Sequence, residues 1–549
     1  MPPVGELPGT MPKADRATGT TNRVEEMFVG RTVFVTGGTG FMGKVLVEKI
    51  LRMCPGVHRI LLLVRPKKGK QPQTRMSEIF ASPLFDRLKS EHPEALRRVE
   101  AVMGDVQAED LGLSAEDRSR VTSETSIVYH CAATIRFDAA LKQAVLLNTR
   151  GTRCMLQLAM EMPKLEAFVH VSTAYCHLDQ EILLEKPYPP PADPHKIIKC
   201  MELLEDNIAE SMTKTILGKL PNTYAFTKAL SEGLVVEYMD KLPVIILRPS
   251  IVIPIWKEPI PGWTDNLNGP MGLLIGAGKG VIRTMYCDSR GHADFIPVDV
   301  VVNATLMLTW DFVTKKPKDP EKRVYNLTSS SEHKISWEEI LDIGKAVSKY
   351  IPLNGIVWYP GGSMKRSKTV HLICVFLFHT IPAYVLDALI MLSGHKPVLR
   401  RVQARITKGF EVFEYYANRV WEFRNDHLVE MREVQNEKEY EDLVIDGKNM
   451  DMYDYFEKCT LAARLYLLGE TLDTLPAARR HLKVMYWVDR ITKAVLMGLL
   501  VWFFFSMAPP TAQTIREITE EMSQMFFSMF RRTVIPLPGA TPVPASSSP

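Results

Sequence analysis

Apolar runs alternate with helical patterns from residue 31 to about residue 250. Each run is almost continuously apolar, as strands buried on both faces of a sheet should be. Between the runs, segments such as KVLVEKILRM and AFTKALSEGLVVEYM carry an apolar residue every three or four positions, which predicts helices. This alternation predicts an α/β fold with a doubly wound parallel sheet. The predicted strands are RTVFV (31–35), HRILLLVR (58–65), VEAVMGD (99–105), SIVYHCAA (126–133), EAFVHVST (166–173) and PVIILRPS (243–250).

The pattern changes after residue 250. The segment PIWKEPIPGWTDNLNGPMGLLIGAGKGVIR (254–283) is rich in Pro, Gly and Trp, so we expect an irregular loop that lines a pocket. From about residue 366 onward, few segments have the pattern of a strand. RVQARITKGFEVFEYYANRVWEFRND and YDYFEKCTLAARLYLLGE then predict a second, mostly helical domain that ends near residue 475.

Two segments, 494–508 and 369–392, are unusually apolar. Residues 494–508 (AVLMGLLVWFFFSMA) are fewer than the roughly 20 that a spanning helix needs, but their Trp and Phe cluster has no polar face, which favours membrane contact. Residues 515–529 place apolar side chains on one side, as in a helix that lies in a membrane interface. Residues 369–392 are nearly as apolar but contain two histidines, a proline and an aspartate. This segment is either a buried core helix or an element that dips into a membrane.

Composition narrows the class of protein. A chain of 549 residues predicts two or more domains, and 46% hydrophobic with 24% charged residues is ordinary for a globular protein. The net charge of +4 is small against 67 basic and 63 acidic residues, so nucleic acid is not predicted as a partner. The eight cysteines have neither zinc-ligand nor disulfide-framework spacing, which predicts reduced thiols and no metal site. The N-terminus lacks the apolar region of a secretory signal, so we expect the body of the chain to face the cytosol.

A glycine-rich turn follows the first predicted strand. The stretch TGGTGFMG (36–43) contains the spacing Gly38-x-Gly40-x-x-Gly43. Alone, this spacing also fits a strand-to-helix turn that needs small residues for packing. Its place between a strand and an amphipathic helical run favours a dinucleotide site, in which glycines make room for a pyrophosphate at the helix N-terminus.

Arg65 ends the second predicted strand, where an NAD site would carry a carboxylate for the adenosine 2′-hydroxyl. A guanidinium at this place suits a 2′-phosphate instead, and Lys67 and Lys68 follow it, so NADPH is predicted over NADH. The alternative interpretation of RPKKGK is a solvated surface turn.

Tyr224 and Lys228, in YAFTK, are spaced to share one face of a helix. We expect the ammonium to lower the pKa of Tyr224 and to tune the phenol as a proton donor and acceptor. The same spacing also arises by chance in a chain of this length. The hydroxyl that would hold a substrate oxygen is predicted at Ser172 or Thr173, where the fifth strand reaches the carboxyl edge of the sheet. A Ser or Thr at a strand end can also serve merely as a helix cap.

Together these motifs resemble a known family. TGGTGFMG, HCAAT, VSTAY, YAFTK and LRPS occur in the order typical of an extended short-chain dehydrogenase/reductase, over about residues 30–365. NTYAFTKALSE, the 254–283 segment, ADFIPVDVVVNA and the helical C-terminal part make nearly the whole chain similar to the fatty acyl-CoA reductase family, whose C-terminal module is also called the male-sterility domain. The resemblance implies a Rossmann fold and the reduction of a long-chain acyl-CoA by two NADPH to a primary alcohol, with release of CoA.

The resemblance also implies roles for individual residues. Tyr224 and Lys228 would be the catalytic pair, and Thr173 the hydroxyl, because Ala174 follows it; Ser172 is the alternative. The cofactor's pyrophosphate would lie on the glycine turn, at Thr36, Gly37, Gly40, Phe41, Met42 and Gly43. Its 2′-phosphate would meet Arg65, and its adenine would lie beside Asp105 and Val106. Its ribose would lie over Cys131, Ala132 and Ala133, and its nicotinamide beside Lys228, Pro249 and Ser250.

Two other functions stay open on the sequence. A membrane-attached hydroxysteroid dehydrogenase or a sugar-nucleotide epimerase would share the sheet and the Tyr/Lys pair, but Arg65 and the 254–283 segment argue against both. A non-catalytic NADPH-binding membrane scaffold would not need Tyr224 and Lys228, and both are present. The chain also departs from the family pattern between Thr173 and Tyr224, where we expect an unusually long insertion (177–215) to cap the cleft.

The predicted organisation has five parts: a flexible leader (1–29), an NADPH-binding Rossmann domain with substrate-binding insertions (30–365), a helical male-sterility-type domain (366–475), membrane-associated helices (484–530) and a disordered tail (531–549). The apolar C-terminal helices predict contact with membrane lipid. The endoplasmic reticulum, with the catalytic domain in the cytosol, is the first choice of membrane. The peroxisome is the second, although the terminal SSSP is not a peroxisomal SKL signal.

Overall fold

A parallel sheet forms the centre of the N-terminal part of the chain. The computed structural model describes residues 21–66, 72–329, 334–507, 520–521 and 523–524. Among these residues, one sheet of seven parallel strands has the order β11-β7-β5-β4-β1-β2-β3. All six predicted strands and the doubly wound fold are confirmed, whereas β11 was not predicted. The strands are β1 (Thr32–Thr36), β2 (Arg59–Val64), β3 (Val99–Met103), β4 (Thr125–His130), β5 (Ala167–Val171), β7 (Val244–Pro249) and β11 (Val324–Leu327).

The strand order reverses its direction of winding between β1 and β4. From β1 the chain moves outward to β2 and β3, then returns to the other side of β1 and continues from β4 toward β11. The direction of winding reverses at β1, so the carboxyl ends of β1 and β4 flank a topological switch point, where open α/β sheets bind ligands.

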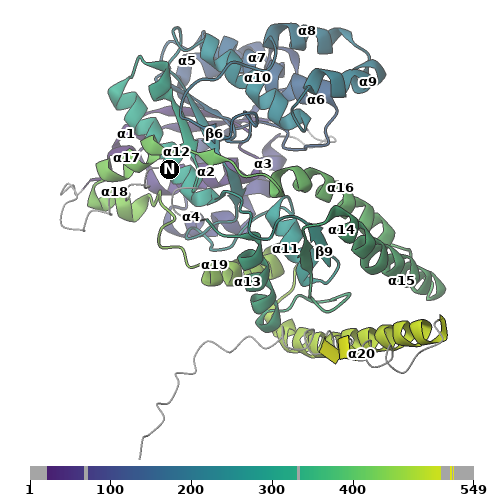
Figure 1. The fold of residues 1–549 in the computed structure, drawn as a ribbon. Helices are drawn as coiled ribbons and strands as arrows, with labels where there is room; N and C mark the ends of the chain where they lie inside the picture. Colours follow the sequence, from purple (N-terminus) through teal and green to yellow (C-terminus); the bar gives the residue numbers. More distant parts are fainter. Residues whose placement is uncertain (1–20, 67–71, 330–333, 508–519, 522, 525–549) are drawn as a thin grey trace, which may run out of the picture. The chain divides into compact units, whose positions relative to one another are not determined.

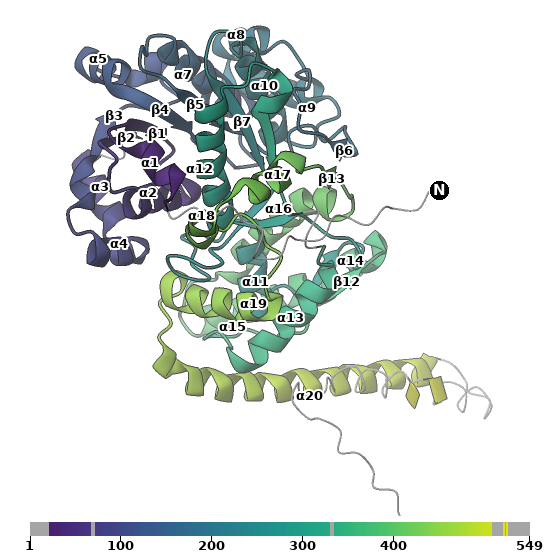
Figure 2. The same cartoon turned by 90° about the vertical axis from the view of Figure 1, so that its left-hand side faces the viewer.

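Helices cover both faces of the sheet (Figures 1 and 2). On one face, α2 and α12 pack over the strands, and their apolar residues share one core with the inward side of β1, β2 and β4. On the other face, α7 and α10 share a second core with the opposite side of the strands. The bounds are α2 (Phe41–Met53), α7 (Gly151–Ala159), α10 (Thr223–Glu237) and α12 (Val298–Lys315).

The insertion after β5 is ordered and is tied to the C-terminal part of the chain. It contains β6 (Ile182–Leu183), α8 (Pro194–Leu203) and α9 (Asp206–Leu217). β6 pairs in parallel with β13 (Glu422–Phe423). Two segments far apart in the sequence therefore form one small sheet.

The 254–283 segment is not irregular throughout, so this prediction was wrong in part. It contains helix α11 (Pro270–Gly278), which starts with Pro270 in its first turn, a position where proline's missing N–H costs nothing. The prediction failed because MGLLIGAG is apolar on all sides and shows no amphipathic period. Around α11 lie β8 (Ile251–Ile253), β9 (Thr284–Tyr286), β10 (Phe295–Pro297), α13 (Trp337–Tyr350) and β12 (Ser363–Lys365).

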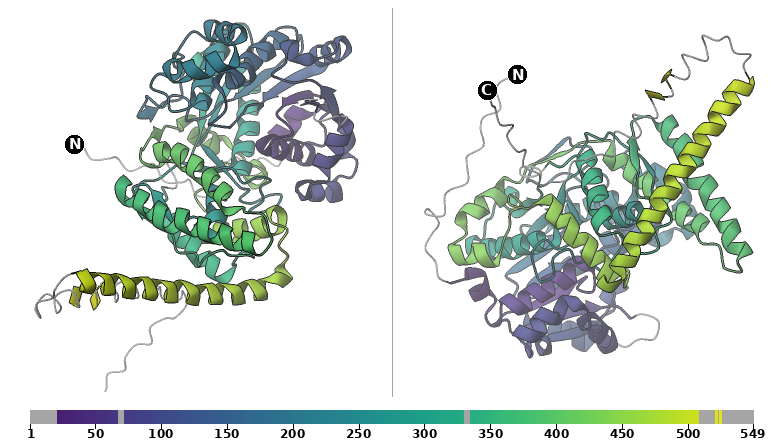
Figure 3. Two further views of the ribbon diagram at one scale, coloured as in Figure 1. Left: turned by 90° about the vertical axis from the view of Figure 1, so that its right-hand side faces the viewer. Right: turned by 90° about the horizontal axis from the view of Figure 1, so that it is seen from below.

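Helices dominate from residue 368 onward, as predicted. α15 and α16 lie side by side (Figures 1 and 3). The described helices are α14 (Lys368–Val375), a π-helical turn (Phe376–Thr380), α15 (Ile381–Leu392), α16 (Leu399–Ala417), α17 (Asp426–Val434), α18 (Glu437–Asp442), α19 (Met452–Ala462) and α20 (Leu475–Met507).

The chain divides into two compact units, one ending at Leu482 and one starting at Lys483. The predicted boundary near residue 366 and the other domain limits stay predictions. The apolar 494–508 segment belongs to α20 as far as Met507. Most of the predicted leader, most of the 515–529 helix and the whole predicted tail lie outside the described residues.

The segment Lys368–Leu392, called here the apolar arm, has an unusual distribution of side chains. Among the described residues it is the helical stretch that is long and apolar enough to cross a membrane, yet only 17% of its most apolar window is buried. Its buried side chains include His371, His379 and Asp387, while Phe376 and Leu389 are 59% and 56% exposed. The interpretation of this segment as a buried core helix was therefore wrong.

Candidate active site

The glycine turn is shaped by close backbone contacts. Gly37 has φ +75°, and a Cβ placed there would lie 2.6 Å from the backbone nitrogen of Ala132. A Cβ on Gly43 would lie 2.3 Å from the carbonyl oxygen of Gly37. Side chains at both positions are excluded by the chain's own backbone, in addition to any need for space around a phosphate. Gly40 is the N-cap of α2, with no side chain of the described residues capping the helix, so the positive end of the helix dipole faces the switch point.

Thr36 joins the ends of β1 and β4. Its hydroxyl oxygen lies 2.7 Å from Nδ1 of His130 and accepts a hydrogen bond from the backbone N–H of Ala132 at 3.3 Å. The predicted ribose segment, Cys131 with Ala132 and Ala133, thus follows β4 directly beside the glycine turn. The structure brings both predicted cofactor segments together at the switch point.

Arg65, Asp105 and Val106 lie at the neighbouring strand ends. Arg65 is exposed and directly follows β2, at the same edge of the sheet as the glycine turn. The Asp105 carboxylate accepts a hydrogen bond from the backbone N–H of Gln107 at 3.0 Å, and buried Val106 packs against Gly151. Lys67 and Lys68 lie outside the described residues.

Tyr224, Thr173 and Lys228 meet where α10 passes the end of β5. Asn222 caps α10 by accepting a hydrogen bond from the N–H of Ala225 at 2.9 Å. Two residues further on, Tyr224 lies close enough to Thr173 for that side chain to lower the pKa of the phenol. The Lys228 ammonium donates to the carbonyl oxygen of Val171, the last residue of β5, at 2.6 Å. Both members of the YAFTK pair therefore reach the same strand end.

The electrostatics of the pair differ from the prediction. Burial raises the pKa of Tyr224, and the nearby Thr173 side chain opposes this effect without reversing it. Burial lowers the pKa of Lys228 to about 8, against the attraction of nearby Cys131 and Glu232. Desolvation therefore dominates at Tyr224, which is held in its protonated, proton-donating form at neutral pH.

Ser172 and Ser250 carry buried hydroxyls at two adjacent strand ends. Among the described residues, neither Oγ atom has a hydrogen-bond partner. The backbone between them is fixed, since the N–H of Ala174 donates to the carbonyl oxygen of Pro249 at 2.9 Å. Unpaired buried hydroxyls are costly, and these two lie at the ends of the neighbouring strands β5 and β7.

Aromatic rings around Tyr224 were missed in the sequence. Phe137 lies edge-on to Tyr224, with ring centroids 5.5 Å apart. Tyr416, on α16, lies 5.8 Å from the ring of Phe137 and accepts a hydrogen bond from Asn222 at 2.8 Å. These residues are far apart in the chain, so no local pattern could reveal the contact.

A buried charge cluster adjoins Tyr224 and Lys228 and was also missed. Glu232 follows Lys228 by four residues on α10, and both of its oxygens accept hydrogen bonds from Arg248, at 2.9 and 2.7 Å. One oxygen also lies 3.1 Å from Nε2 of His177, and the other accepts from the Cys176 thiol at 3.3 Å. Although Cys176, His177 and Glu232 are as close together as metal ligands would be, the guanidinium already neutralises the carboxylate. The prediction that no metal takes part stays a prediction.

The fold and the site define a class of protein: an oxidoreductase that uses a nicotinamide dinucleotide. The family described as male sterility protein matches residues 35–305 and, through a second region, residues 378–470.

Relatives of known function are similar over most of the chain. Fatty acyl-CoA reductase 1 of Rattus norvegicus is 37% identical over 508 residues, which is 92% of this chain and 98% of the relative. The human enzyme of the same name is 36% identical over 508 residues. Fatty acyl-CoA reductase 2 of Mus musculus is 35% identical over 509 residues. Both alignments cover 92% of this chain and 98% of the relative. The chain belongs to the fatty acyl-CoA reductase family.

Solved structures support the fold. The reductase domain of a non-ribosomal peptide synthetase from Mycobacterium tuberculosis has a TM-score of 0.53 at 19% identity and covers 81% of this chain and 96% of that one. The terminal reductase domain of the myxalamid pathway has a TM-score of 0.50 at 20% identity, covering 80% and 91%. At these identities the likeness concerns the fold alone.

Proposed function

We propose that this chain reduces a long-chain fatty acyl-CoA to a primary fatty alcohol with NADPH and releases CoA. The observation that carries the proposal is the contact of Tyr224 with Thr173, next to Lys228, at the carboxyl edge beside the glycine turn. Membership of the fatty acyl-CoA reductase family supports the substrate class.

The residues at the switch point fit a bound dinucleotide. The open N-terminus of α2 and the side-chain-free turn at Gly37 and Gly43 would receive the pyrophosphate. The unpaired hydroxyls of Ser172 and Ser250 would meet the nicotinamide amide. When bound, the cofactor supplies the hydride. Exposed Arg65, whose position suits a 2′-phosphate, supports NADPH over NADH.

The protein side chains handle the charge that develops on the carbonyl oxygen. Tyr224 is protonated at neutral pH and donates its proton to that oxygen, while Thr173 holds the same oxygen by its hydroxyl. The Lys228 ammonium, fixed on Val171, stabilises the negative charge from nearby.

When the resulting hemithioacetal collapses, its hydroxyl proton returns to Tyr224, the carbon–sulfur bond breaks, and the CoA thiolate leaves an aldehyde behind. A second NADPH must then replace the spent cofactor. In the second reduction Tyr224 protonates the aldehyde oxygen, with Thr173 and Lys228 in the same roles, and the alcohol forms; solvent restores the proton on Tyr224.

We further propose that the apolar arm and the apolar part of α20 contact membrane lipid. The arm turns His371, His379 and Asp387 inward and its large apolar side chains outward, opposite to a helix of a soluble core. An amphiphilic substrate and an apolar product would both benefit from a membrane surface nearby. The endoplasmic reticulum is the proposed membrane and the peroxisome the alternative.

Product analysis tests the reaction. Membranes carrying the protein are incubated with palmitoyl-CoA and either NADPH or NADH, and the lipids are identified. We expect alcohol with NADPH, and Tyr224→Phe should lower kcat by at least about 100-fold, the usual loss for a general acid. Tyr238→Phe, at the far end of α10, is the matched control and should keep full activity. Aldehyde as the sole product would contradict the two-step claim, and equal activity of Tyr224→Phe would contradict the catalytic assignment.

Arg65→Ala tests the cofactor. The loss of one charge-assisted contact to the 2′-phosphate should raise the KM for NADPH by about tenfold or more and leave that for NADH unchanged. Arg97→Ala removes an exposed arginine that precedes strand β3, at the opposite edge of the sheet, and serves as the control. An equal effect of Arg65→Ala on both cofactors would contradict the preference.

A further inference from the structure

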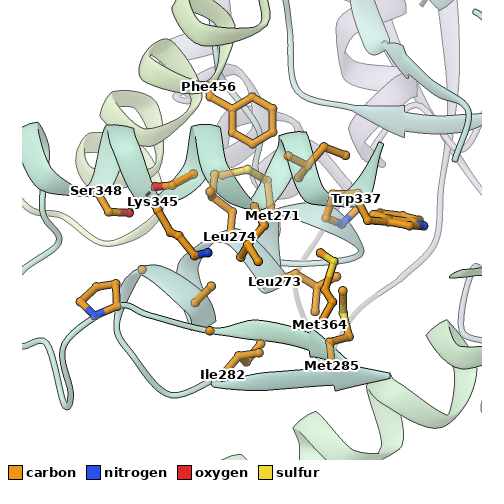
Figure 4. Close-up of a pocket in the computed structure, with 18 of the residues that line it drawn as sticks. Met271, Leu273, Leu274, Ile282, Met285, Trp337, Lys345, Ser348, Met364 and Phe456 are labelled. Atoms are coloured by element: carbon orange, nitrogen blue, oxygen red, sulfur yellow. Dashed lines mark hydrogen bonds between the residues drawn. The ribbon is translucent and has the colours of Figure 1, made fainter. Parts of the chain in front are cut away.

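An apolar cavity of about 170 Å³ lies between α11, α13 and α19. Figure 4 shows Met271, Leu273 and Leu274 of α11 gathered beside α13, with Met285 and Met364 on the strands opposite. The cavity exceeds the roughly 150 Å³ that holds a benzene molecule in an apolar protein core. It can therefore hold a stretch of hydrocarbon without movement of its walls.

The polar groups of the cavity wall are bonded elsewhere. The Tyr455 hydroxyl donates to the carbonyl oxygen of Pro254 at 2.8 Å, and the Thr284 hydroxyl lies 3.2 Å from Nδ1 of His371. The lining also includes Lys345, whose ammonium donates to Asp342 at 3.3 Å, and Ser348, whose hydroxyl donates to the carbonyl oxygen of Gly344 at 2.7 Å. Most of the other lining residues are aliphatic, aromatic or methionine. A wall of this kind suits an alkyl chain.

Gly344 stands inside α13 and lines the cavity. Glycine in a helix interior costs roughly 0.5–1 kcal/mol relative to alanine. No positive φ requires it here, and a Cβ would meet only Leu274, at an ordinary 3.8 Å. The missing side chain therefore serves to keep the cavity open.

Strand β8 leads from the catalytic edge to the cavity. Ser250 precedes β8, and Ile253 at the end of that strand lines the cavity, a path of about 10 Å at the usual rise of a strand. Ile251 packs against both the apolar cluster around Ala225, next to Tyr224, and the cluster around Trp337. Packed apolar side chains thus connect the two places.

Helix α16 provides a second connection along the same route. Its Tyr416 contacts Phe137, which contacts Tyr224. One turn earlier, Phe413 lies 5.0 Å from Trp337 and lines the cavity. Residues three apart share a helix face, so one side of α16 spans from the catalytic tyrosine to the cavity.

We propose that this cavity binds the distal part of the substrate's acyl chain and that Gly344 sets how much chain it admits. The proposal rests on the proposed function, because the thioester carbonyl must lie at Tyr224 while the chain follows β8. Short acyl chains end before the cavity, and long chains fill it. The cavity is therefore a chain-length determinant for an alkyl substrate.

Gly344→Leu tests this by filling the cavity. It should lower both kcat/KM for palmitoyl-CoA and the affinity for a fluorescent polyene fatty acid, measured without NADPH, by about tenfold or more, since several methylenes lose their burial. Hexanoyl-CoA turnover should change less than about twofold. Gly409→Leu, at an interior glycine of α16 with open space around it, is the matched control and should leave both values unchanged.

Leu274→Ala provides the opposite change if Gly344→Leu fails to fold. The enlarged cavity should shift the preference toward acyl chains longer than palmitoyl, by about threefold in the ratio of kcat/KM values. Unchanged chain-length profiles in the variants that fold would overturn the proposal. In another outcome, wild-type protein binds the fluorescent fatty acid, exchanges it for palmitoyl-CoA and still reduces no substrate. That result would contradict the proposed function but would support the acyl-binding site.

Discussion

Helix α12 and the apolar arm are two apolar helical segments with opposite surroundings. In α12, 15 of the 18 residues are buried between the sheet and neighbouring helices. In the arm, the large apolar side chains face outward. The few side chains that are buried are mostly polar. Composition alone does not distinguish the two segments.

The two segments satisfy their polar groups in the same way. Asp299 of α12 accepts hydrogen bonds from the backbone N–H groups of Trp256 and Lys257, at 2.9 and 2.8 Å. Asp387 of the arm accepts from the N–H groups of Val398, Leu399 and Arg400, each at 2.9 Å. In both cases a buried carboxylate holds a neighbouring turn in place. The difference lies in the apolar side chains, which the protein covers on α12 and leaves open on the arm.

The largest expected effect concerns lipid binding by the arm. Replacing Phe376 and Leu389 together by Ser removes two exposed apolar side chains that would each contribute about 1.5–3 kcal/mol on entering a membrane. Partition onto phosphatidylcholine vesicles, measured by flotation, should weaken by about 100-fold or more. The control replaces Leu203 and Ile208, which are exposed on α8 and α9, by Ser. Flotation equal to that of wild type would contradict lipid contact by the arm.

The second prediction concerns stability. Leu306→Ala in α12 should lower the free energy of unfolding in urea by about 2–5 kcal/mol, because Leu306 is fully buried. Leu389→Ala in the arm should change it by less than about 0.5 kcal/mol, since that residue is 56% exposed. If both variants lost the same free energy of unfolding, the arm would be packed against protein in solution, and the two segments would not differ in burial.

The smallest expected effect concerns the pH dependence of the reaction, which depends on the buried ammonium of Lys228. Because burial lowers the pKa of Lys228 to about 8, the ammonium is lost above that pH, and kcat/KM should fall about tenfold per pH unit. Stability should respond in the opposite direction. Between about pH 8 and the ordinary lysine value near 10.5, the unfolded chain binds more protons, so this group makes folding more favourable as pH rises. A flat rate profile from about pH 7 to 10 would rule out an essential ammonium at Lys228.

Much of the fold was predictable because the strands are apolar on both faces and the helices between them are amphipathic. β11 escaped prediction because VYNL is only four residues long and contains a buried asparagine, whose amide donates to the carbonyl oxygen of Leu183. α11 was not predicted because its segment is rich in Gly and Pro, which are typical of loops. Short or uniformly apolar elements give no period to detect.

The candidate site was predictable only where its residues are close in sequence. The spacing of Tyr224 and Lys228 and the glycine turn gave correct expectations of which segments come together. The sign of the pKa change at Tyr224 was not predictable, because it depends on burial by distant rings such as Phe137. One signal was available for the charge cluster: Glu232 continues the spacing of the catalytic pair, and Arg248 is a charged residue inside an apolar strand.

The parallel pairing of β6 with β13 has a consequence for synthesis of the chain on the ribosome. The seven-stranded sheet is complete once Leu327 has emerged, but the strand that pairs with β6 is incomplete until Phe423 follows. Tyr416 and Trp421, which surround Tyr175 near the catalytic edge, also appear only then. A nascent chain can therefore fold its proposed nucleotide site well before the rim of its catalytic cleft, and during that interval the insertion after β5 is exposed to chaperones and proteases.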